Sequence, residues 1–442
     1  MFNPGRHITR FLLLLLYYQA AKAVMQEIWK ERFFAVTLLY LGILEIFWLL
    51  MEAGNIRQRR ILDLVYGQFF GALCANIFFA ALTCTISSYS VPGIFTAFFV
   101  LTLLEAGTGM TWAAIFFYLH LKKQAYKKAL FIYGNREDYR RVILENHREN
   151  GYFRIEKAVH FQTDFSAIEK LLEQYQALYL GDIPTGLRNK LLKLCVCMCR
   201  ECYSIPKVSD IYIRSGKIIR LYDKVLFQYP PGGLTREQEA VKRGVDIIIS
   251  LALLLGAFPV MLAIGCLIKL EDGGPVFYRQ ERITKNGKPF HMLKFRSMKT
   301  DAEKEGPRLS YVNDQRVTRV GRYIRNLHFD ELPQLFNVLK GEMSLVGPRP
   351  ERKEFIQEYS RVIPEFSQRL KVKGGLTGYA QIYGKYNTGP EDKVKYDLIY
   401  IYNYSLRLDI RLLFLTVRIL FQKENTQGVE EGQRSAVRKK NH

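Results

Sequence analysis

Hydrophobic residues along this chain are gathered into a few long runs, and most of these runs lie before residue 122. Four of them cover residues 8–25, 33–51, 61–86 and 92–121. Each is close to the about 20 apolar residues that an α-helix needs to cross a lipid bilayer. The pattern predicts four membrane-crossing helices within residues 1–121.

The first run also has features of a secretory signal peptide. Arg6 and Arg10 precede a run of leucines, and Ala21-Lys22-Ala23 loosely matches a cleavage site. Because three more apolar runs follow, a retained membrane helix is the favoured interpretation.

Basic residues beside the four runs predict how the helices are oriented. If all four runs cross, one side receives three basic clusters: Arg6 and Arg10; Arg57, Arg59 and Arg60; and Lys122, Lys123, Lys127 and Lys128. The other side receives only the short loop at residues 30–32 and the uncharged turn at 87–92. Since Lys and Arg are retained on the cytoplasmic side, we expect both ends of this region to be cytoplasmic.

Residues 122–228 have a different pattern, in which short strand-like and helix-like apolar segments alternate, as at 129–133, 168–175, 177–180 and 187–199. This alternation predicts a small α/β domain. Tyr133 is followed by Gly134-Asn135-Arg136, which offers one glycine where a dinucleotide-binding turn needs three. We therefore expect no nucleotide cofactor in this domain. Pro230-Pro231-Gly232-Gly233 marks a linker over residues 229–241.

A fifth apolar run covers residues 247–270 and has Pro259 near its middle. The run is long enough to cross a bilayer, but Arg243 precedes it and Lys269 lies near its other end. Basic residues at both ends argue weakly against a simple crossing. Proline removes a backbone donor and clashes with the preceding turn. A helix broken at Pro259 that enters the membrane and returns is therefore the alternative to a fifth crossing, and the residues alone leave both open.

The formal net charge of +22 is compatible with a nucleic acid, an anionic lipid surface or small anionic substrates as partners. The basic residues flank apolar runs, which favours the membrane. The chain has no Cys/His finger pattern and no aromatic-basic motif of RNA-binding modules, so we expect no nucleic-acid partner.

The seven cysteines do not form the pattern of a secreted disulfide framework. Three lie in apolar runs, and the other four form the cluster Cys195, Cys197, Cys199 and Cys202. If one helix ran through the cluster, Cys197 would point away from the other three. A four-thiolate metal site would require that helix to break, so packing cysteines are the favoured interpretation.

Two adjacent carboxylates, Asp330 and Glu331, stand directly before a segment with helical apolar spacing. The simplest interpretation is local: Asp330 caps the helix, Glu331 favours the positive end of its dipole, and Pro333 occupies the first turn. The surroundings point to chemistry instead, because many arginines flank the pair: Arg316, Arg319, Arg322 and Arg325 before it, and Arg349 and Arg352 after it.

Guanidinium groups match phosphate oxygens in a bidentate manner. A carboxylate pair among them either holds Mg²⁺ with the phosphates of a substrate or supplies a nucleophile for phosphoryl transfer. The residues therefore indicate a phosphate-handling site around Asp330 and Glu331.

The last part of the chain contains a series of motifs in order: Lys242-Arg243 with Asp246, Gly274-Pro275-Val276-Phe277, Arg279-Gln280-Glu281-Arg282, Lys294-Phe295-Arg296-Ser297-Met298, Asp301-Ala302-Glu303, Asp330 to Gln334, and Asn337 to Pro350. Together they closely resemble the bacterial monotopic phosphoglycosyl transferases, which start exopolysaccharide, capsule and O-antigen assembly. The layout upstream resembles the long members of that family.

The resemblance implies a membrane protein of α/β type with a four-helix transmembrane bundle over residues 1–121. A Rossmann-like domain would follow over 122–228, and then a catalytic domain over 242–425 with a re-entrant helix at 247–270. It also implies a bacterial inner-membrane protein whose catalytic domain is cytoplasmic. Residues 396–420 fit either a helix lying along the membrane or an amphipathic helix on the catalytic core. The basic tail, 426–442, is expected to be disordered.

The activity that the resemblance implies is transfer of a sugar phosphate from a UDP-sugar to undecaprenyl phosphate, with release of UMP. In that mechanism Asp330 attacks the β-phosphorus to form an aspartyl phospho-sugar, and Glu331 helps to bind Mg²⁺. Four basic residues are the expected phosphate contacts: Lys294, Arg296, Arg325 and Arg349. Salt bridges to surface acids are the alternative role for these four residues.

This chain departs from the family pattern at two places. Gly374 stands where the usual turn has proline, which predicts a looser loop, and Asn326, Leu327 and His328 replace the usual residues before the dyad. Two other functions stay open: a membrane glycosyltransferase that releases UDP, and an inactive scaffold for polysaccharide assembly. Long apolar bundles commonly associate, which leaves a homodimer as an alternative to a monomer.

Overall fold

The computed structural model describes residues 4–51, 53, 61–87, 89–116, 118, 127–148, 153–299, 314–384 and 389–420. Contacts divide the chain into two compact units, Met1–Ile205 and Pro206–His442. The basic loops around Arg57 and Lys122 and the tail at 426–442 lie outside the described residues, so the orientation and the tail stay predictions.

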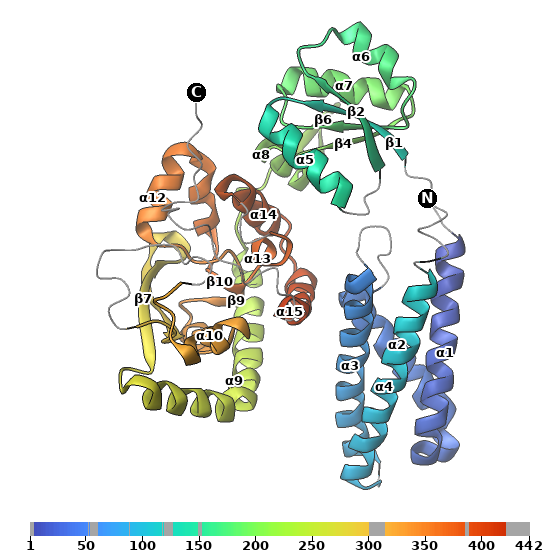
Figure 1. The fold of residues 1–442 in the computed structure, drawn as a ribbon, viewed down its shortest axis with the longest axis vertical. Coiled ribbons are helices and arrows are strands. Elements are labelled where there is room, and N and C mark those ends of the chain that lie inside the picture. The colour runs from blue at the N-terminus through green and yellow to red at the C-terminus, as the bar shows by residue number, and fades with distance from the viewer. Residues whose placement is uncertain are drawn as a thin grey trace. The chain divides into compact units, whose positions relative to one another are not determined.

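The first unit begins with the four predicted apolar helices (Figure 1): α1 (Pro4–Trp29), α2 (Phe33–Leu50), α3 (Ile61–Ile86) and α4 (Val91–Phe116). The short 3-10 helix η1 (Lys30–Arg32) joins α1 to α2. Helix α1 packs against α2 and α4, and α3 packs against the same two helices, so the four form a bundle. The prediction of four helices in this region is confirmed.

Four helical stretches of the described chain are long and apolar enough to cross a bilayer: Phe11–Leu50, Leu64–Ile86, Val91–Ile115 and Arg236–Asp272. Large apolar side chains such as Phe11, Phe34 and Phe99 are more than half exposed on the bundle surface. An apolar outer surface is what a lipid-facing helix bundle requires.

A polar network joins all four helices inside this bundle. Glu105 of α4 is fully buried and accepts hydrogen bonds at 2.5 Å from the Tyr40 hydroxyl of α2 and at 2.8 Å from the Asn76 amide of α3. The Tyr17 hydroxyl of α1 donates to the Glu105 main-chain carbonyl at 2.8 Å. Interhelical hydrogen bonds of this kind fix which faces of membrane helices meet.

The rest of the first unit is a small α/β fold. Its strands are β1 (Lys127–Tyr133), β2 (Phe153–His160), β3 (Ala177–Leu180) and β4 (Glu201–Ser204), and its helices are α5 (Arg136–Arg148), α6 (Phe165–Leu172) and α7 (Thr185–Cys197). The strands form one parallel sheet in the order β2-β1-β3-β4. Residues 129–132 of the central strand β1 are fully buried, as expected for a parallel sheet covered on both faces.

The cysteine cluster does not lie on one helix. Helix α7 ends at Cys197, Cys199 adopts a left-handed conformation with φ of 53°, and Cys202 lies on β4. Cys195 is buried in the core of the domain, whereas Cys197 and Cys199 are exposed. The single helix assumed in the sequence argument is therefore wrong, because the chain turns back at Cys199 to begin β4.

The second unit holds the remaining elements: α8 (Val208–Ser215), β5 (Lys217–Leu221), β6 (Lys224–Gln228), α9 (Arg236–Asp272), β7 (Phe277–Ile283), β8 (Pro289–Phe295), α10 (Arg319–Asn326), α11 (Gln334–Lys340), β9 (Ser344–Val346), α12 (Lys353–Val362), β10 (Gly375–Thr377), α13 (Tyr379–Tyr383), α14 (Pro390–Tyr402) and α15 (Leu406–Leu420), with 3-10 helices η4 (Lys285–Gly287), η5 (Phe329–Glu331) and η6 (Pro364–Lys371). The predicted domain limits remain predictions, although α8, expected in the middle domain, packs on α14 here.

Helix α9 is 37 residues long and contains the fifth apolar run. It begins with a capping box, in which Thr235 and Gln238 exchange hydrogen bonds of 3.0 and 3.2 Å, and it ends at Gly273 in the left-handed conformation. Figure 1 draws α9 as two arms that meet at an angle. Pro259 lies inside the helix, and an internal proline is a frequent cause of a sharp kink.

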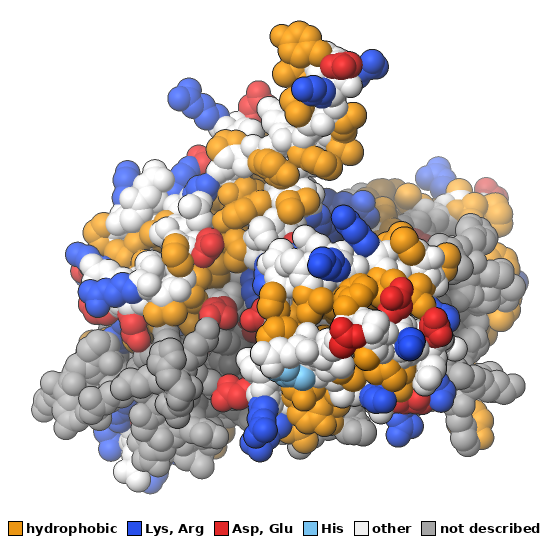
Figure 2. Space-filling view, turned by 90° about the horizontal axis from the view of Figure 1, so that it is seen from above, with side chains coloured by type: hydrophobic (Ala, Val, Ile, Leu, Met, Phe, Trp, Pro, Cys, Tyr) orange, Lys and Arg blue, Asp and Glu red, His pale blue; other side chains and the backbone are white. Residues whose placement is uncertain are grey.

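The core of the second unit forms where α9, α11, β9, α14 and α15 meet. The unit contains two short parallel strands, β9 and β10, and a separate antiparallel hairpin of β7 and β8. Leu412 and Leu415 of α15 are fully buried in this core, so α15 packs as an amphipathic helix on it. On the face of the molecule shown in Figure 2, Lys and Arg side chains are interspersed with acidic and hydrophobic ones.

Candidate active site

The two predicted catalytic carboxylates lie in a tight turn before α11. Asp330 and Glu331 belong to the 3-10 helix η5, which follows His328 in a left-handed conformation with φ of 55°. Helix α11 begins only at Gln334, and its N-terminal flanking residue is Pro333, without a side-chain cap. Asp330 is therefore not the cap of this helix, and the local explanation for its presence does not apply. Its side chain is only 8% exposed.

Glu331 is held by two cations that come from different elements. Arg349, in the segment after β9, donates from Nη2 to Oε1 at 2.5 Å and from Nη1 to Oε2 at 3.3 Å. Lys294, on β8, donates from Nζ to Oε1 at 3.4 Å. The Arg349 contact is the bidentate arrangement that guanidinium and carboxylate groups favour. The structure thus brings together Glu331, Lys294 and Arg349, three of the residues predicted from the sequence.

The surroundings shift the pKa values of the two carboxylates in opposite directions. Burial alone would raise the pKa of Glu331, but Arg349 and Lys294 outweigh it and hold that pKa well below its usual range. Burial raises the pKa of Asp330, although Lys294 and Arg325 act in the opposite direction. Two neighbouring carboxylates with pKa values shifted apart are typical of sites in which each has its own role.

Arg325 and Arg296, the other two predicted phosphate contacts, lie in different surroundings. Arg325 is on α10, half-buried, and its charge lowers the pKa of Asp330. Arg296 follows the end of β8 and forms a salt bridge with Asp272 at the end of α9. Two of its guanidinium nitrogens, Nε and Nη1, are buried without a hydrogen-bond partner. Its role in phosphate binding stays a prediction.

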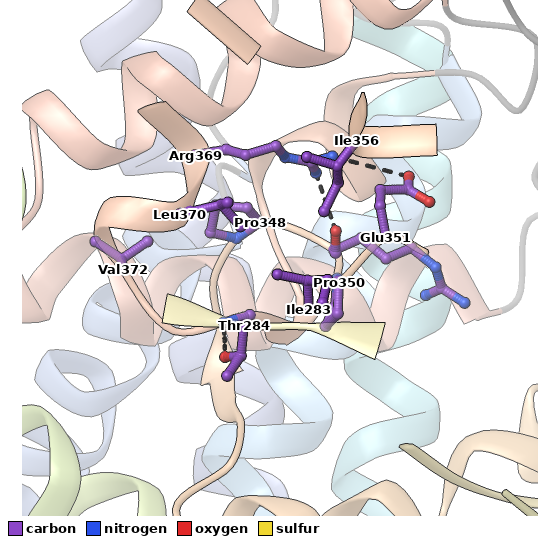
Figure 3. A pocket seen from close by; sticks show the side chains of 11 residues that line it. Ile283, Thr284, Pro348, Pro350, Glu351, Ile356, Arg369, Leu370 and Val372 are labelled. Carbon is purple, nitrogen blue, oxygen red and sulfur yellow. Dashed lines mark hydrogen bonds and ion pairs between the residues drawn. The ribbon is translucent and has the colours of Figure 1, made fainter. Parts of the chain in front are cut away.

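The loop that carries Arg349 is fixed through its main chain. Arg369 donates to the Arg349 carbonyl at 3.0 Å, and Arg282 donates to the Pro350 carbonyl at 3.1 Å. Figure 3 shows Arg369 directed at this loop, with Glu351 and Pro350 opposite it. Arg369 is 4% exposed and forms a 2.8 Å salt bridge with Asp397, which is 1% exposed. Burial raises the pKa of Asp397 to about 6, although Arg369 opposes this change.

The turn before β10 and β10 itself form hydrogen bonds with the same loop. The Gly347 amide donates to the Thr377 carbonyl, and the Gly375 amide to the Pro348 carbonyl, both at 2.8 Å. Gly374, which was expected to loosen this turn, is buried, and a Cβ atom there would lie 2.4 Å from the Pro350 ring. Any larger residue at 374 would have to displace the loop that presents Arg349, so the turn is tight and not loose.

Asn337 of α11 forms hydrogen bonds with β8, the strand that carries Lys294. Its Oδ1 accepts from the Leu293 amide at 2.9 Å, and its Nδ2 donates to the His291 carbonyl at 2.8 Å. Arg243 of α9 donates to the Leu339 carbonyl at 2.6 Å, at the end of α11. Asp246 accepts from the Leu345 amide of β9 at 3.1 Å. These motif residues therefore position the elements around the dyad and do not line it.

The family resemblance implies Mg²⁺, and the donors at the dyad fit it in combination with a substrate. No group of three His, Cys, Asp or Glu side chains that could hold a metal occurs in the described parts of the chain. Mg²⁺ is commonly bound by one or two carboxylates together with substrate phosphates and water. Each carboxylate oxygen has two lone pairs, so Glu331 keeps acceptor capacity beside its contacts with Arg349 and Lys294.

Comparison with known proteins assigns this site to a family. A sequence model described as bacterial sugar transferase matches residues 237–423. The chain is also 41% identical over 188 residues to an exopolysaccharide production protein of Rhizobium leguminosarum bv. phaseoli, over 40% of this chain and 93% of that protein. The chain belongs to the bacterial sugar transferase family. The prediction of the family from the ordered motifs is thus confirmed.

Two further relatives of this sugar transferase carry specific names. A UDP-N-acetylgalactosamine-undecaprenyl-phosphate N-acetylgalactosaminephosphotransferase of Aeromonas hydrophila is 39% identical over 238 residues, covering 53% of this chain and 56% of that protein. A UDP-glucose:undecaprenyl-phosphate glucose-1-phosphate transferase of Xanthomonas campestris pv. campestris is 37% identical over 254 residues, covering 54% and 52%. The chain therefore spans little more than half the length of these two relatives.

Several residues of the sugar transferase site were not found from the sequence. Arg282 lies in one of the family motifs, but the motif does not show its role. Its contacts with Pro350 and Glu351 arise because strand β7 lies next to the Arg349 loop in the folded chain. Arg369 and Asp397 carry no local signal, because their pairing joins residues 28 positions apart in sequence. Only the folded core shows that they act on Arg349.

Proposed function

We propose that this chain transfers a sugar-1-phosphate from a UDP-sugar to undecaprenyl phosphate and releases UMP, through an aspartyl phospho-sugar intermediate on Asp330. This would be the first membrane step in building an exopolysaccharide, a capsule or an O-antigen. The names of the relatives from Aeromonas and Xanthomonas support the class of reaction.

One observation carries the proposal: a buried Asp330 lies next to a Glu331 that Arg349 and Lys294 hold in one orientation. Two cations beside two carboxylates balance their charges, so an entering diphosphate does not meet a site of net negative charge. Arg349 is 40% exposed, so part of its guanidinium group faces solvent and is free to meet a phosphate oxygen. Such fixed charges stabilise the charge that develops on a transferring phosphoryl group.

In the first step an Asp330 carboxylate oxygen attacks the β-phosphorus of the UDP-sugar. A new oxygen–phosphorus bond forms, and the bond from that phosphorus to the bridging oxygen breaks, so its electron pair leaves with UMP. In the second step a phosphate oxygen of the lipid attacks the same phosphorus, and the Asp330 carboxylate leaves. Covalent catalysis of this type divides one difficult transfer into two easier ones.

Each of the surrounding residues has a defined task in this proposal. Arg349 and Lys294 neutralise phosphate oxygens and keep Glu331 ionised. Lys294 and Arg325 oppose the effect of burial on Asp330, which favours its reactive carboxylate form. Mg²⁺, held by Glu331 with Asp330 close by, would supply further neutralisation of the diphosphate.

The proposal includes a membrane arrangement. The apolar run in α9, its two arms and the internal Pro259 support a re-entrant helix, with the catalytic domain on the cytoplasmic face of the inner membrane. The parallel sheet of the first unit supports a Rossmann-like middle domain. A cysteine reporter placed at residue 247 or 270 should be labelled only from the cytoplasm. Labelling of residue 270 from outside would mean that the helix crosses.

Nucleotide release tests the reaction itself. Full-length protein in detergent is incubated with Mg²⁺, undecaprenyl phosphate and a panel of UDP-sugars, and wild type is compared with Asp330→Asn. The proposal predicts UMP from wild type with at least one sugar and none from Asp330→Asn. Release of UDP would instead indicate a glycosyltransferase. Turnover by Asp330→Asn would refute the role of Asp330 as nucleophile.

A further inference from the structure

A basic cleft lies in the second unit at the C-terminal end of α11, the helix that begins beside the dyad. It has a volume of about 350 Å³ and lies between the β7–β8 turn, the C-terminal end of α11 and the segment before β10. Four lysines line it, together with a single acidic residue: Lys285, Lys288, Lys340 and Lys373, with Glu342. We call it the lysine cleft. Its volume falls within the range of pockets that bind small molecules.

The positive charge of the lysine cleft is poorly compensated by the protein. Lys285 forms a salt bridge with Glu239 of α9. Within the described parts of the chain, no hydrogen bond or ion pair joins the side-chain ammonium groups of Lys288, Lys340 or Lys373 to another residue. Glu342 already accepts a 2.6 Å hydrogen bond from the Asn337 side chain. Three ammonium groups around the cleft are therefore available to an anion.

The surroundings of Lys373 disfavour its positive charge. It is half-buried, and burial lowers its pKa. Arg243 lowers the pKa further, and Lys285 acts in the same direction, whereas Asp246 and Glu239 oppose them. Like charges gathered at a partly desolvated position destabilise one another, and such clusters are more common at functional sites than elsewhere. A bound anion would remove this repulsion.

The lysine cleft is separate from the dyad. Strand β8 begins at the cleft with Pro289 and carries Lys294 five residues later, which corresponds to about 17 Å along an antiparallel strand. Helix α11 likewise starts beside the dyad and ends at the cleft with Lys340. The side of the cleft formed by Lys288 and Lys340 is therefore remote from Lys294, whereas Lys373 lies nearer to the Arg349 loop, because the next residue, Gly374, packs against Pro350.

The cleft also lies away from the apolar part of α9. Glu239, which pairs with Lys285, precedes the apolar run at residue 247 by eight positions, or about 12 Å of helix. This distance favours an occupant from the aqueous phase over the head group of a lipid.

We propose that the lysine cleft is a second binding site, for a small soluble anion that carries at least two phosphate charges. Several convergent ammonium groups suit a ligand of high charge density, since lysine acts as a point charge toward phosphate. The inference does not depend on the reaction proposed above.

Titration calorimetry on the full-length protein in neutral detergent, at low salt and without Mg²⁺, tests the site with inorganic pyrophosphate as the probe. Three variants are compared with wild type. Lys288→Gln with Lys373→Gln removes two cleft charges, and Arg349→Ala removes the main cation at the dyad. Lys217→Gln with Lys224→Gln, on the exposed hairpin of β5 and β6, is the matched control for loss of two lysines.

The proposal predicts that Arg349→Ala retains a binding event that the cleft variant weakens by roughly tenfold or more, while the hairpin control binds as wild type. Unchanged binding by the cleft variant would overturn it, as would loss of all binding in Arg349→Ala or absence of binding in wild type. In lipid nanodiscs the pyrophosphate affinity should not change when phosphatidylcholine is replaced by phosphatidylglycerol. Cleft-dependent competition by phosphatidylglycerol would contradict the soluble ligand.

Discussion

The bidentate contact between Arg349 and Glu331 gives a sharp test of how this site works. Arg349→Lys keeps the positive charge but replaces the planar two-armed donor with a single ammonium group. Of the two present contacts, 2.5 Å to Oε1 and 3.3 Å to Oε2, lysine can retain at most one. The orientation of Glu331 and the phosphate contact of Arg349 should both be weakened.

The size of the effect can be worked from these contacts. A hydrogen bond between charged groups contributes about 1.5–3 kcal/mol. Because Arg349 is 40% exposed, solvent screens the contact and the lower end applies, about 1.5 kcal/mol. At about 1.4 kcal/mol per factor of ten, kcat/KM should fall by roughly tenfold. Loss of the positioning of Glu331 would add to this, so roughly tenfold is the minimum expected.

The assay is steady-state UMP release by purified protein, with thermal unfolding measured in parallel. Arg361→Lys, on the exposed face of α12, is the matched control and should behave as wild type. Arg349→Lys should unfold within a few degrees of wild type, since its charge is kept. If kcat/KM of Arg349→Lys stayed within twofold of wild type, the bidentate contact would have no part in the reaction.

Other predictions concern the support of the site, its protonation and the bundle. Arg369→Gln removes the donor to the Arg349 carbonyl and leaves Asp397 buried without its cation, so kcat/KM should fall by roughly tenfold and the unfolding temperature should drop; an unchanged kcat/KM would show that the Arg349 loop needs no such support. Burial raises the pKa of Asp330, so activity should be lost as pH falls through a value above the usual aspartate range; a pH–rate profile that stays flat down to pH 4 would contradict this. Glu105→Leu removes the buried acceptor that Tyr40 and Asn76 share, leaving only the Tyr40–Asn76 and Asn76–Thr102 hydrogen bonds, and should lower the unfolding temperature, whereas Glu105→Gln should be milder; equal effects would argue against the network.

Much of the fold could be predicted because its signals are local. Apolar runs of bilayer length gave the four helices of the bundle, with α3 beginning and ending where expected, at Ile61 and Ile86. Asn286-Gly287, a pair typical of tight hairpin turns, lies between β7 and β8, and Asn286 has a positive φ of 59° there. Such features depend on residues close in sequence, so they can be predicted without knowledge of the fold.

The site was predicted in part, for a similar reason. The dyad and its two cations stand in motifs whose residue types match phosphate chemistry, and the structure brings Lys294 and Arg349 to Glu331. The expected helix cap was wrong, because Asp330 lies within η5, which ends at Glu331, and α11 begins only at Gln334. Hydrophobic spacing predicts that a helix follows, but it does not fix where the first helical residue lies.

Contacts between distant segments could not be predicted. Lys294 and Arg296 were both expected to contact phosphate, but their partners here come from distant segments: Lys294 pairs with Glu331, and Arg296, after the end of β8, pairs with Asp272. The salt bridge between Arg369 and Asp397 could not be predicted either, since it depends on how η6 packs against α14. No local sequence pattern encodes these contacts, because they form only when the core is assembled.

The most direct test of the account is to look for the covalent intermediate on Asp330. Full-length protein is mixed with a UDP-sugar that supports turnover, in the absence of undecaprenyl phosphate, and intact mass and peptide mapping follow. The account predicts a phospho-sugar adduct on the peptide that contains Asp330, absent in Asp330→Asn and discharged when lipid phosphate is added. UMP release without an adduct, or an adduct on another residue, would contradict the central role of Asp330.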